Sequence, residues 1–349
     1  MWHCVRQRPH HLVRALNDDA HTVDIFTAAG YRERKQYPAF SQHVYSLPLL
    51  SSRLYSVPVA GTVSRRINYA IERRVHERFL QSFADIHIYQ RCPSALTPEV
   101  SRLTGYLIYD CVDFWAGFRG ADERIGEWEH LLCDRADEIW VVSNFLAKRH
   151  ARWNNKIKII PNGVDFEHFS AASRAPVSSD VLPHVIYIGA IFDWFDVTLL
   201  RETALLLPQF HFTLVGPRRL SREAIKELCL DNITWVGPRS YSDLPRLLSE
   251  AHVAVIPFMI NDLIRGTSPI KLYEYLAAGI PVVASPMPEV LPFIKPGVVA
   301  CAETPYDFAN AIQDAYRFAD SQRCRAVAKA NSWRSRFSAL LGPLADSCK

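Results

Sequence analysis

The sequence predicts an α/β protein with two doubly wound parallel sheets, one in each half of the chain. Short apolar strand candidates alternate with longer helical patterns, which is typical of parallel sheets joined by right-handed crossovers. The strand candidates are continuously apolar, as expected of strands that helices cover on both faces. A length of 349 residues, 49% of them hydrophobic and 22% charged, suits about two globular domains.

The second half shows this alternation most clearly. Its strand candidates are His184–Ile191, Phe210–Gly216, Ile233–Gly237, Val253–Phe258, Pro281–Ser285 and Val298–Ala302. The helical patterns between them are Val197–Leu207, Ser221–Cys229, Tyr241–Ala251, Ile270–Ala278 and Tyr306–Phe318.

The first half repeats the scheme more loosely. Its strand candidates are Val23–Ala28, Asp85–Gln90, Tyr106–Tyr109, Glu138–Val142 and Ile157–Ile160, and its helical patterns are Arg65–Phe83, Glu123–Arg135 and Asn144–Arg152. A doubly wound domain normally opens with a strand, but a helix already begins at Pro9. Only Met1–Val5 is available for that strand, so it is absent, lies upstream, or is replaced by another segment that completes the sheet.

Residues 170–180 are rich in Ser, Ala and Pro and lack periodicity, which is a linker composition. We therefore predict an amino-terminal domain over 1–169 and a second domain over 181–330. Ligands of doubly wound domains bind at the carboxyl ends of the strands. The two domains are accordingly expected to face each other across a cleft formed by these ends.

Charge and cysteine usage narrow the choice of partners. Residues 1–109 carry 14 Lys and Arg against 8 Asp and Glu, although the whole chain has a net charge of only +4. This indicates a local patch for an anionic partner rather than a nucleic-acid-binding protein.

The eight cysteines include no C-x-x-C and no His pair at zinc spacing nearby, which predicts reduced thiols of a cytosolic protein and no metal site. No apolar run is long enough to span a membrane.

The segment Arg265–Ser285 carries the clearest chemistry. Ser268 suits an N-cap, Pro269 the first helical position and Gly279 the residue after the helix. The start of such a helix is a natural phosphate site, and the otherwise unfavourable Lys271 in its first turn suits a docked anion. Glu274, one turn later, can accept hydrogen bonds from a ribose diol. The alternative is an ordinary surface lysine and glutamate.

This segment resembles the donor site of GT-B glycosyltransferases of family 4 and their close bacterial relatives. Other parts agree in order: Ile160–Asp165 resembles the family's PNGVD motif, Tyr187–Gly189 the first strand of its donor domain, and FTLVGP and ITWVGP later strands. Ser332 and Trp333 resemble the start of a last helix, over 331–349, that crosses back to the first domain. The resemblance implies a nucleotide-sugar site; we expect its residues to be Gly189, Arg239, Arg265, Thr267, Ser268, Ile270, Lys271 and Glu274.

Two departures from the family stand out. The family's first donor-site glutamate is replaced by Gly266, and the run Gly189–Asp196 lacks the usual Arg and Lys. We therefore expect the charge of the donor diphosphate to be neutralised by Lys271, Arg265, Arg239 or the start of the helix itself. These substitutions resemble a bacterial subgroup that acts in exopolysaccharide or teichuronic acid synthesis.

The acceptor site is expected in the first domain. Residues 7–11, QRPHH, resemble a loop of that subgroup, which makes Arg8, His10 and His11 candidate acceptor-binding residues. Asp110 and Asp113 follow an apolar strand, where a carboxylate can remove the proton of the acceptor hydroxyl. The alternatives are capping or packing histidines and an aspartate that caps the loop.

The helical pattern Arg65–Phe83 is amphipathic, with Ile67, Ile71, Val75, Phe79 and Phe83 repeating every four residues. Its basic face is either ordinary solvated surface or a peripheral contact with anionic lipid at the inner face of the plasma membrane. The second interpretation suits a lipid-linked acceptor.

We therefore expect a GT-B glycosyltransferase that moves a sugar from a UDP- or GDP-sugar to a lipid-linked or glycan acceptor, with no cofactor and no metal required. Two alternatives remain open: a sugar-nucleotide epimerase, and a non-catalytic subunit of the same fold. A dehydrogenase is disfavoured because no G-x-G-x-x-G follows any strand.

Overall fold

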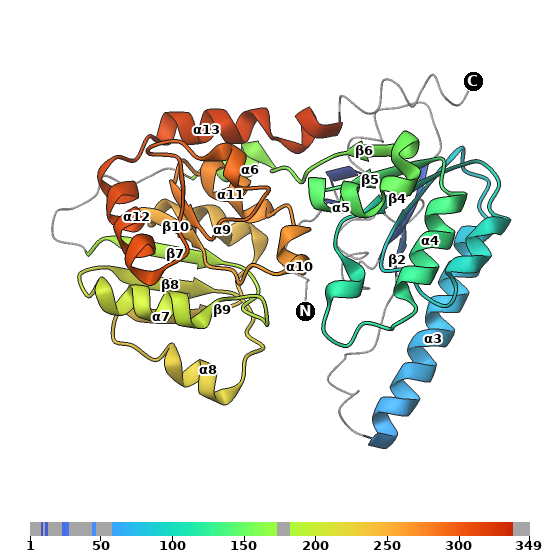
Figure 1. Cartoon of the computed structure of the whole chain (residues 1–349), viewed down its shortest axis with the longest axis horizontal. Helices are drawn as coiled ribbons and strands as arrows, with labels where there is room; N and C mark the ends of the chain where they lie inside the picture. The colour runs from blue at the N-terminus through green and yellow to red at the C-terminus, as the bar shows by residue number, and fades with distance from the viewer. Residues whose placement is uncertain are drawn as a thin grey trace. The chain divides into compact units, whose positions relative to one another are not determined.

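The computed structural model describes residues 8, 9, 11, 12, 23–27, 44–46, 58–172 and 182–337, with the side chains of 44–46, 58–66 and 68 left aside. The described chain forms two compact units (Figure 1). The amino-terminal unit comprises the described residues from Arg8 to Ile160 together with Phe337, and the carboxy-terminal unit runs from Pro161 to Arg336. The division falls ahead of the predicted linker at 170–180, most of which lies outside the described residues.

The amino-terminal unit contains a six-stranded parallel sheet in the order β2-β1-β3-β4-β5-β6. Its strands are β1 (Val23–Thr27), β2 (Val44–Ser46), β3 (Ile86–Gln90), β4 (Tyr106–Cys111), β5 (Glu138–Val141) and β6 (Ile157–Ile159). Its helices are α3 (Pro58–Leu80), α4 (Ile125–Arg135) and α5 (Asn144–Arg149), with short 3-10 helices at Thr97–Arg102, Trp115–Gly117 and Ala151–Lys156.

The strand pairing at the edge of this sheet bears on whether a strand precedes the first helix. The segment Met1–Val5 lies outside the described residues. Strand β1 pairs directly with β3, so no strand lies between them, and β2, which the sequence pattern did not predict, pairs with the outer edge of β1. Another segment thus adds a strand to the sheet.

The carboxy-terminal unit contains a second six-stranded parallel sheet in the order β12-β11-β10-β7-β8-β9. Its strands are β7 (His184–Ile188), β8 (His211–Val215), β9 (Ile233–Gly237), β10 (Val253–Ile256), β11 (Val282–Ala284) and β12 (Val299–Cys301). Its helices are α6 (Phe166–Ser170), α7 (Val197–Leu206), α8 (Arg222–Glu227), α9 (Leu244–Ser249), α10 (Asp262–Arg265), α11 (Ile270–Ala277), α12 (Pro305–Arg317) and α13 (Ser321–Ala330), with 3-10 turns at Tyr241–Asp243 and Leu291–Phe293.

Helices cover both faces of this second sheet (Figure 1). Helix α7 packs against α12, and α11 packs against α6 and α13. Because both faces are covered, every residue of β10 and β11 is buried, which explains their continuous apolar sequences. The predicted α/β class with two doubly wound parallel sheets is confirmed.

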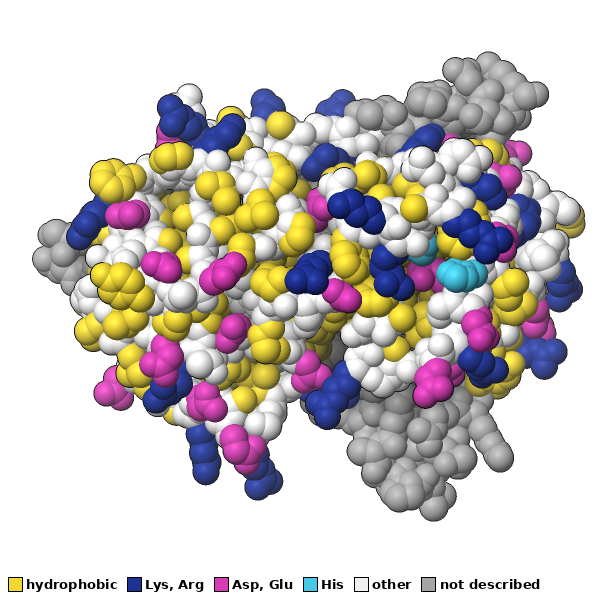
Figure 2. All heavy atoms as spheres, viewed as in Figure 1, with side chains coloured by type: hydrophobic (Ala, Val, Ile, Leu, Met, Phe, Trp, Pro, Cys, Tyr) yellow, Lys and Arg dark blue, Asp and Glu magenta, His cyan; other side chains and the backbone are white. Residues whose placement is uncertain are grey.

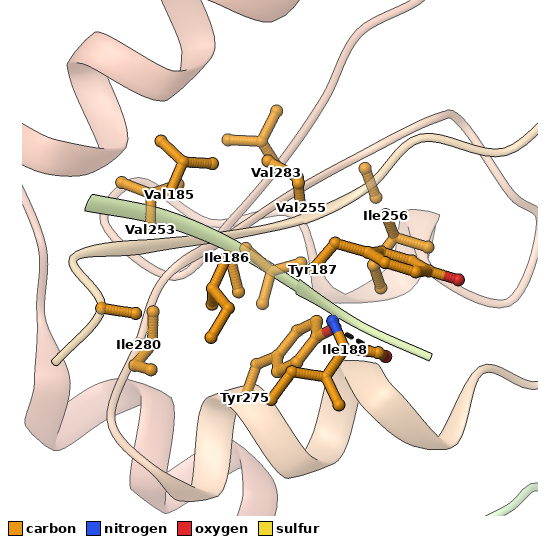
Figure 3. Packing of buried hydrophobic residues seen from close by; sticks show 14 of the residues in the cluster. Val185, Ile186, Tyr187, Ile188, Val253, Val255, Ile256, Tyr275, Ile280 and Val283 are labelled. Atoms are coloured by element: carbon orange, nitrogen blue, oxygen red, sulfur yellow. Dashed lines mark hydrogen bonds between the residues drawn. The ribbon is translucent and has the colours of Figure 1, made fainter. Parts of the chain in front are cut away.

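The centre of the second core lies where β7 meets β10 and α11 (Figure 3). Along β7, Val185 and Tyr187 point to one face of the sheet while Ile186 and Ile188 point to the other. The Tyr275 hydroxyl of α11 accepts a hydrogen bond from the Ile188 N–H (2.7 Å) and donates one to its carbonyl (3.1 Å). This pair of bonds fixes α11 to the carboxyl end of β7.

The predicted amphipathic helix Arg65–Phe83 has different limits. Helix α3 begins earlier, at Pro58, and ends at Leu80, so Phe83 lies beyond it and is 96% exposed. Phe79 is fully buried against Phe26 (ring centroids 5.2 Å), whereas Ile67 remains 42% exposed. Of the apolar residues that repeat every four positions, only those near the carboxyl end of α3 therefore pack on the sheet. Within the described residues, no helix combines the length and apolarity that spanning a membrane requires.

Candidate functional site

Helix α11 begins where the sequence predicts, but its cap is different. Pro269 occupies the N-cap position and no side chain caps the helix, so the prediction that Ser268 is the N-cap is wrong. The Ser268 hydroxyl instead accepts a hydrogen bond from the Asn162 N–H (3.1 Å), and the Ser268 carbonyl accepts one from the Asn162 side-chain amide (2.8 Å). The hydroxyl is therefore used to hold the loop rather than to cap the helix.

Gly189 lies at the carboxyl end of β7, next to the start of α11. A Cβ atom at position 189 would lie 3.0 Å from the Lys271 Cε and 3.0 Å from the Tyr187 hydroxyl. One at Gly216, at the end of β8, would lie 1.9 Å from the Gly189 carbonyl oxygen. Both glycines have positive φ, +155° and +141°. Because both positions lack a side chain, the loops after β7 and β8 and the Lys271 side chain can lie in close contact.

Lys271 and Glu274 lie one turn apart near the start of α11 and interact electrostatically. The Lys271 ammonium lies 4.8 Å from the Phe258 ring centroid and 5.6 Å from that of Tyr187, within the range of cation–π attraction. Burial lowers the pKa of Lys271 to about 8, while the negative charge of Glu274 opposes that change. Burial raises the pKa of Glu274 to about 7, and Lys271 opposes that rise.

This arrangement favours an anionic ligand. The first turn of a helix has N–H groups without partners inside the helix and carries the positive end of the dipole. Burial removes the lysine ammonium beside it from water and disfavours its charged form. A bound phosphate would place a negative charge next to the ammonium and stabilise the charged form. Glu274 is only 7% exposed, so its carboxylate is largely removed from water.

The other predicted donor-site residues lie around this pair in two different settings. Ser268 is buried, while Ile270 and Thr267 are half-buried and the Thr267 hydroxyl donates to the Leu263 carbonyl (2.9 Å). Arg265 is exposed and pairs with Asp262 at 3.2 Å. Arg239 is exposed after β9, and its guanidinium donates to the Pro238 carbonyl. The structure thus brings Gly189, Lys271 and Glu274 together and leaves both arginines at the surface. On the face in Figure 2, basic and acidic side chains are interspersed.

The run after β7, which lacks the family's Arg and Lys, is anchored to the end of β10. The Asp196 N–H donates to the Pro257 carbonyl (2.9 Å), and the Met259 N–H donates to the Trp194 carbonyl (2.9 Å). The Asp196 carboxylate caps α7 by accepting from the Leu199 N–H (2.9 Å). The run therefore forms a fixed turn beside Gly189.

In the amino-terminal unit, Arg8 and Asp110 form a buried ion pair. The Arg8 Nε donates to the Asp110 Oδ2 (2.8 Å) and Nη1 donates to the Ile160 carbonyl (2.9 Å). Gln90, at the end of β3, also donates to Asp110. One polar atom of each of these three side chains is buried and has no hydrogen-bond partner among the described residues: Arg8 Nη2, Asp110 Oδ1 and Gln90 Oε1. The predicted acceptor residue and the predicted base are thus direct partners.

Asp113 lies two residues beyond the end of β4 and is half-buried. Burial raises the pKa of its carboxyl to about 7. Unlike Asp110, Asp113 forms no ion pair with any residue that the structure describes. Of the two predicted acceptor histidines, His11 is buried and His10 lies outside the described residues.

Several residues of the candidate site were not singled out from the sequence. Tyr187 and Phe258 surround the Lys271 ammonium, Tyr275 fixes α11 to β7, and Gln90 completes the buried group around Asp110. Tyr187, Phe258 and Tyr275 belong to strongly apolar segments and look like core residues. Asn162 lies in a recognised motif, but the motif does not indicate its partner.

Comparison with known proteins finds a family match over the part of the chain that contains α11. Residues 183–317, which contain α11 and the ends of β7 and β10, match the family described as glycosyl transferases group 1. The chain is 30% identical over 228 residues to TuaH of Bacillus subtilis (strain 168), whose name describes a glycosyltransferase of teichuronic acid biosynthesis. That match covers 59% of this chain and 57% of TuaH, so the chain spans little more than half the length of this relative.

Solved structures share the fold at low sequence identity. Anabaena Alr3699/HepE, solved in complex with UDP-glucose, has a TM-score of 0.66 at 14% identity and covers 93% of this chain and 100% of its own. Sucrose-phosphate synthase from Thermosynechococcus elongatus has a TM-score of 0.65 at 18% identity, covering 97% and 92% of the two chains. Residues 183–317 thus match the glycosyl transferases group 1 family, and the chain shares with these solved structures the GT-B fold expected from its sequence.

Proposed function

We propose that this protein is a glycosyltransferase that transfers a sugar from a nucleoside diphosphate sugar to an acceptor in cell-surface glycan synthesis. The observation that carries the proposal is the desolvated Lys271–Glu274 pair at the start of α11, inside the region that matches the glycosyl transferases group 1 family. The name of TuaH supports the cell-surface context, and the UDP-glucose bound by HepE supports a UDP-sugar as donor, with a GDP-sugar as the alternative.

In this proposal the diphosphate lies at the start of α11. The helix dipole and the Lys271 ammonium neutralise it, and Glu274 accepts hydrogen bonds from the ribose hydroxyls. The exposed guanidinium of Arg265 or Arg239 adds charge at the rim. The same groups stabilise the charge that develops on the leaving diphosphate, so no metal ion is required for the transfer.

Sugar selection has to differ from the family pattern. Gly266, at the end of α10, offers no carboxylate where the family has its first donor-site glutamate. The turn at 190–196, fixed to the end of β10, lies beside Gly189 and is our candidate for contacting the donor sugar.

We assign acceptor activation to the amino-terminal unit. Transfer to a hydroxyl needs a group that accepts its proton, and Asp113 is the half-buried carboxylate at the end of β4 that is not held in an ion pair by any described residue. Asp110, which accepts hydrogen bonds from Arg8 and Gln90, is the second candidate for the base. Arg8, His10 and His11 are the proposed acceptor-binding residues.

The proposed acceptor is lipid-linked or a growing glycan, met at the inner face of the plasma membrane. Helix α3 presents exposed Arg73, Arg74 and Arg78 together with Ile67 and Tyr69, which are 42% and 49% exposed. Arginines beside exposed apolar groups suit anionic headgroups. Replacing the three arginines with glutamine should reduce co-sedimentation with anionic vesicles and leave UDP binding unchanged. Equal sedimentation of both proteins would refute the membrane contact.

The deciding experiment offers the purified chain UDP-, GDP- and dTDP-sugars with and without acceptor membranes, and measures nucleotide release and label transfer. The proposal expects acceptor-dependent transfer that Glu274→Ala abolishes. Glu227→Ala, which removes an exposed glutamate of α8, is the matched control and should keep full activity.

The two alternatives give different results in the same assay. A sugar-nucleotide epimerase converts the donor into its isomer without any acceptor. A non-catalytic subunit gives neither transfer nor isomerisation with any donor. Either result would replace the glycosyltransferase proposal.

A further inference from the structure

Three ligating side chains converge in the interior of the amino-terminal unit, and one of them, Cys111, lies in the chain between Asp110 and Asp113. Cys111 Sγ lies 3.6 Å from Glu129 Oε1 and 3.8 Å from His150 Nε2, and these last two atoms are 3.8 Å apart. The three residues are 0%, 5% and 3% exposed. They come from the end of β4, from α4 and from the residue after α5. We propose that Cys111, Glu129 and His150 form a zinc site.

The distances match the dimensions of a tetrahedral zinc site. Zinc binds sulfur at about 2.3 Å and nitrogen or oxygen at about 2.0–2.2 Å, which puts pairs of ligand atoms about 3.3–3.6 Å apart. The observed separations of 3.6 and 3.8 Å need to shorten by only a few tenths of an ångström. Three protein ligands leave the fourth position to a water molecule.

The charges also balance. Among the described residues, no lysine or arginine forms an ion pair with Glu129, although its carboxylate is buried, and burying an unpaired charge is costly. On binding, Zn²⁺ displaces the thiol proton of Cys111 to solvent. The ion, the thiolate, the carboxylate and a neutral imidazole then have no net charge.

Neighbouring groups already orient two of the ligands. The Tyr109 hydroxyl donates to Glu129 Oε1 (2.6 Å), and Cys133 Sγ lies 3.8 Å from the other ring nitrogen of His150. Such outer contacts fix the rotamer and tautomer of metal ligands. The bound ion would tie β4, α4 and the end of α5 together, so its role is structural and separate from the donor site of the other unit.

The test uses the tag-free full chain, so that no affinity tag supplies ligands. After incubation with Zn²⁺ and removal of excess metal, the wild-type protein should retain about one equivalent by elemental analysis. Cys111→Ser and His150→Ala should each lower retention at least tenfold. Cys324→Ser removes an equally buried cysteine from the carboxy-terminal unit and should retain the wild-type amount.

The wild-type protein alone gives a second readout that does not depend on the folding of a variant. With Co²⁺ in place of zinc, the site should show thiolate-to-metal charge-transfer absorption and the intense visible bands of tetrahedral cobalt. Wild-type protein that retains no metal, a cobalt spectrum without the thiolate band, or equal retention by Cys111→Ser would each overturn the proposal.

Discussion

Asn162 holds Ser268 at two points: its backbone N–H donates to the Ser268 hydroxyl and its side-chain amide donates to the Ser268 carbonyl. Both residues are buried, at 8% and 2% exposure. The segment after β6 thereby fixes the loop that leads into α11, and with it the position of Lys271. The PNGVD motif acts here as a support for the start of a helix.

Asn162→Ala should weaken UDP binding because the loop before α11 loses its side-chain anchor. The Ser268 carbonyl is left without its partner, at a cost of about 1–3 kcal/mol. If about 1.4 kcal/mol of this reaches the binding equilibrium, the Kd rises roughly tenfold. Isothermal titration with UDP measures the change.

Asn232→Ala is the control for a general loss of stability. The Asn232 amide donates to the Ala204, Leu207 and Phe210 carbonyls, so its removal also destabilises the carboxy-terminal unit. Its UDP affinity should nevertheless equal that of the wild type. Equal weakening in both variants would mean that Asn162 acts only through stability.

UDP affinity should fall as the pH rises above about 8. Burial lowers the pKa of Lys271 to about 8, so the free protein loses this charge in that range, whereas a bound diphosphate favours the protonated amine. Above this range the affinity should decline by at most about tenfold per pH unit. Glu274, with a pKa of about 7, is already ionised there and does not contribute to the decline.

Binding measured from pH 7 to 9 with Lys271→Met separates this effect from ionisation of the nucleotide. The variant should bind UDP weakly at every pH and lose the additional decline. Lys226→Met, which removes an exposed lysine of α8, should keep the wild-type profile. A decline that persists in Lys271→Met would assign it to another group.

Asp113→Asn should lower the turnover number by about 10²–10⁴ because an amide cannot accept the acceptor proton. The proposed donor site lies in the other unit, so the Kd for UDP should stay at the wild-type value. Asp122→Asn, at an exposed position of the following loop, serves as the control and should retain turnover. If Asp113→Asn kept the wild-type turnover, Asp113 would not be the base, and Asp110 or the leaving diphosphate would accept the proton.

Arg8→Met should destabilise the amino-terminal unit by about 3–5 kcal/mol, because it leaves the Asp110 carboxylate buried without its ion-pair partner. Arg246→Met removes the exposed ion pair between Arg246 of α9 and Glu250, the residue after this helix, and should change stability by no more than about 0.5 kcal/mol. Urea unfolding of both variants measures the contrast. Similar small changes would show that Arg8 contributes little to folding.

The regular parts of the fold could be predicted because burial on both faces imposes a readable pattern. The predicted strand Val253–Phe258 contains β10, Val253–Ile256, and the predicted helix Ile270–Ala278 differs from α11 by one residue. Strand β2 has only three residues, Val44–Ser46, too few for any periodicity. The short helices α6 and α10, five and four residues long, were not predicted for the same reason.

The candidate site could be predicted only where local sequence determines it. Ser268 precedes a proline and a helix, so an N-cap was the natural interpretation, but a residue 106 positions away uses its hydroxyl. Cys111 and His150 are 39 positions apart, with Glu129 between them on a different element, so no spacing rule for zinc ligands finds the three. Contacts of this kind arise from tertiary packing, which a linear pattern does not contain.

The close contact between Gly189 and Gly216 limits how the proposed donor site can be engineered. Any side chain at position 216 would collide with the backbone of the first loop, so the two loops behave as one joined piece of main chain. Transplanting either loop alone from another enzyme would break the fit. A change of sugar preference is therefore better sought by altering side chains on the turn at 190–196. Both glycines should be kept, because they allow the loops after β7 and β8 to lie in contact.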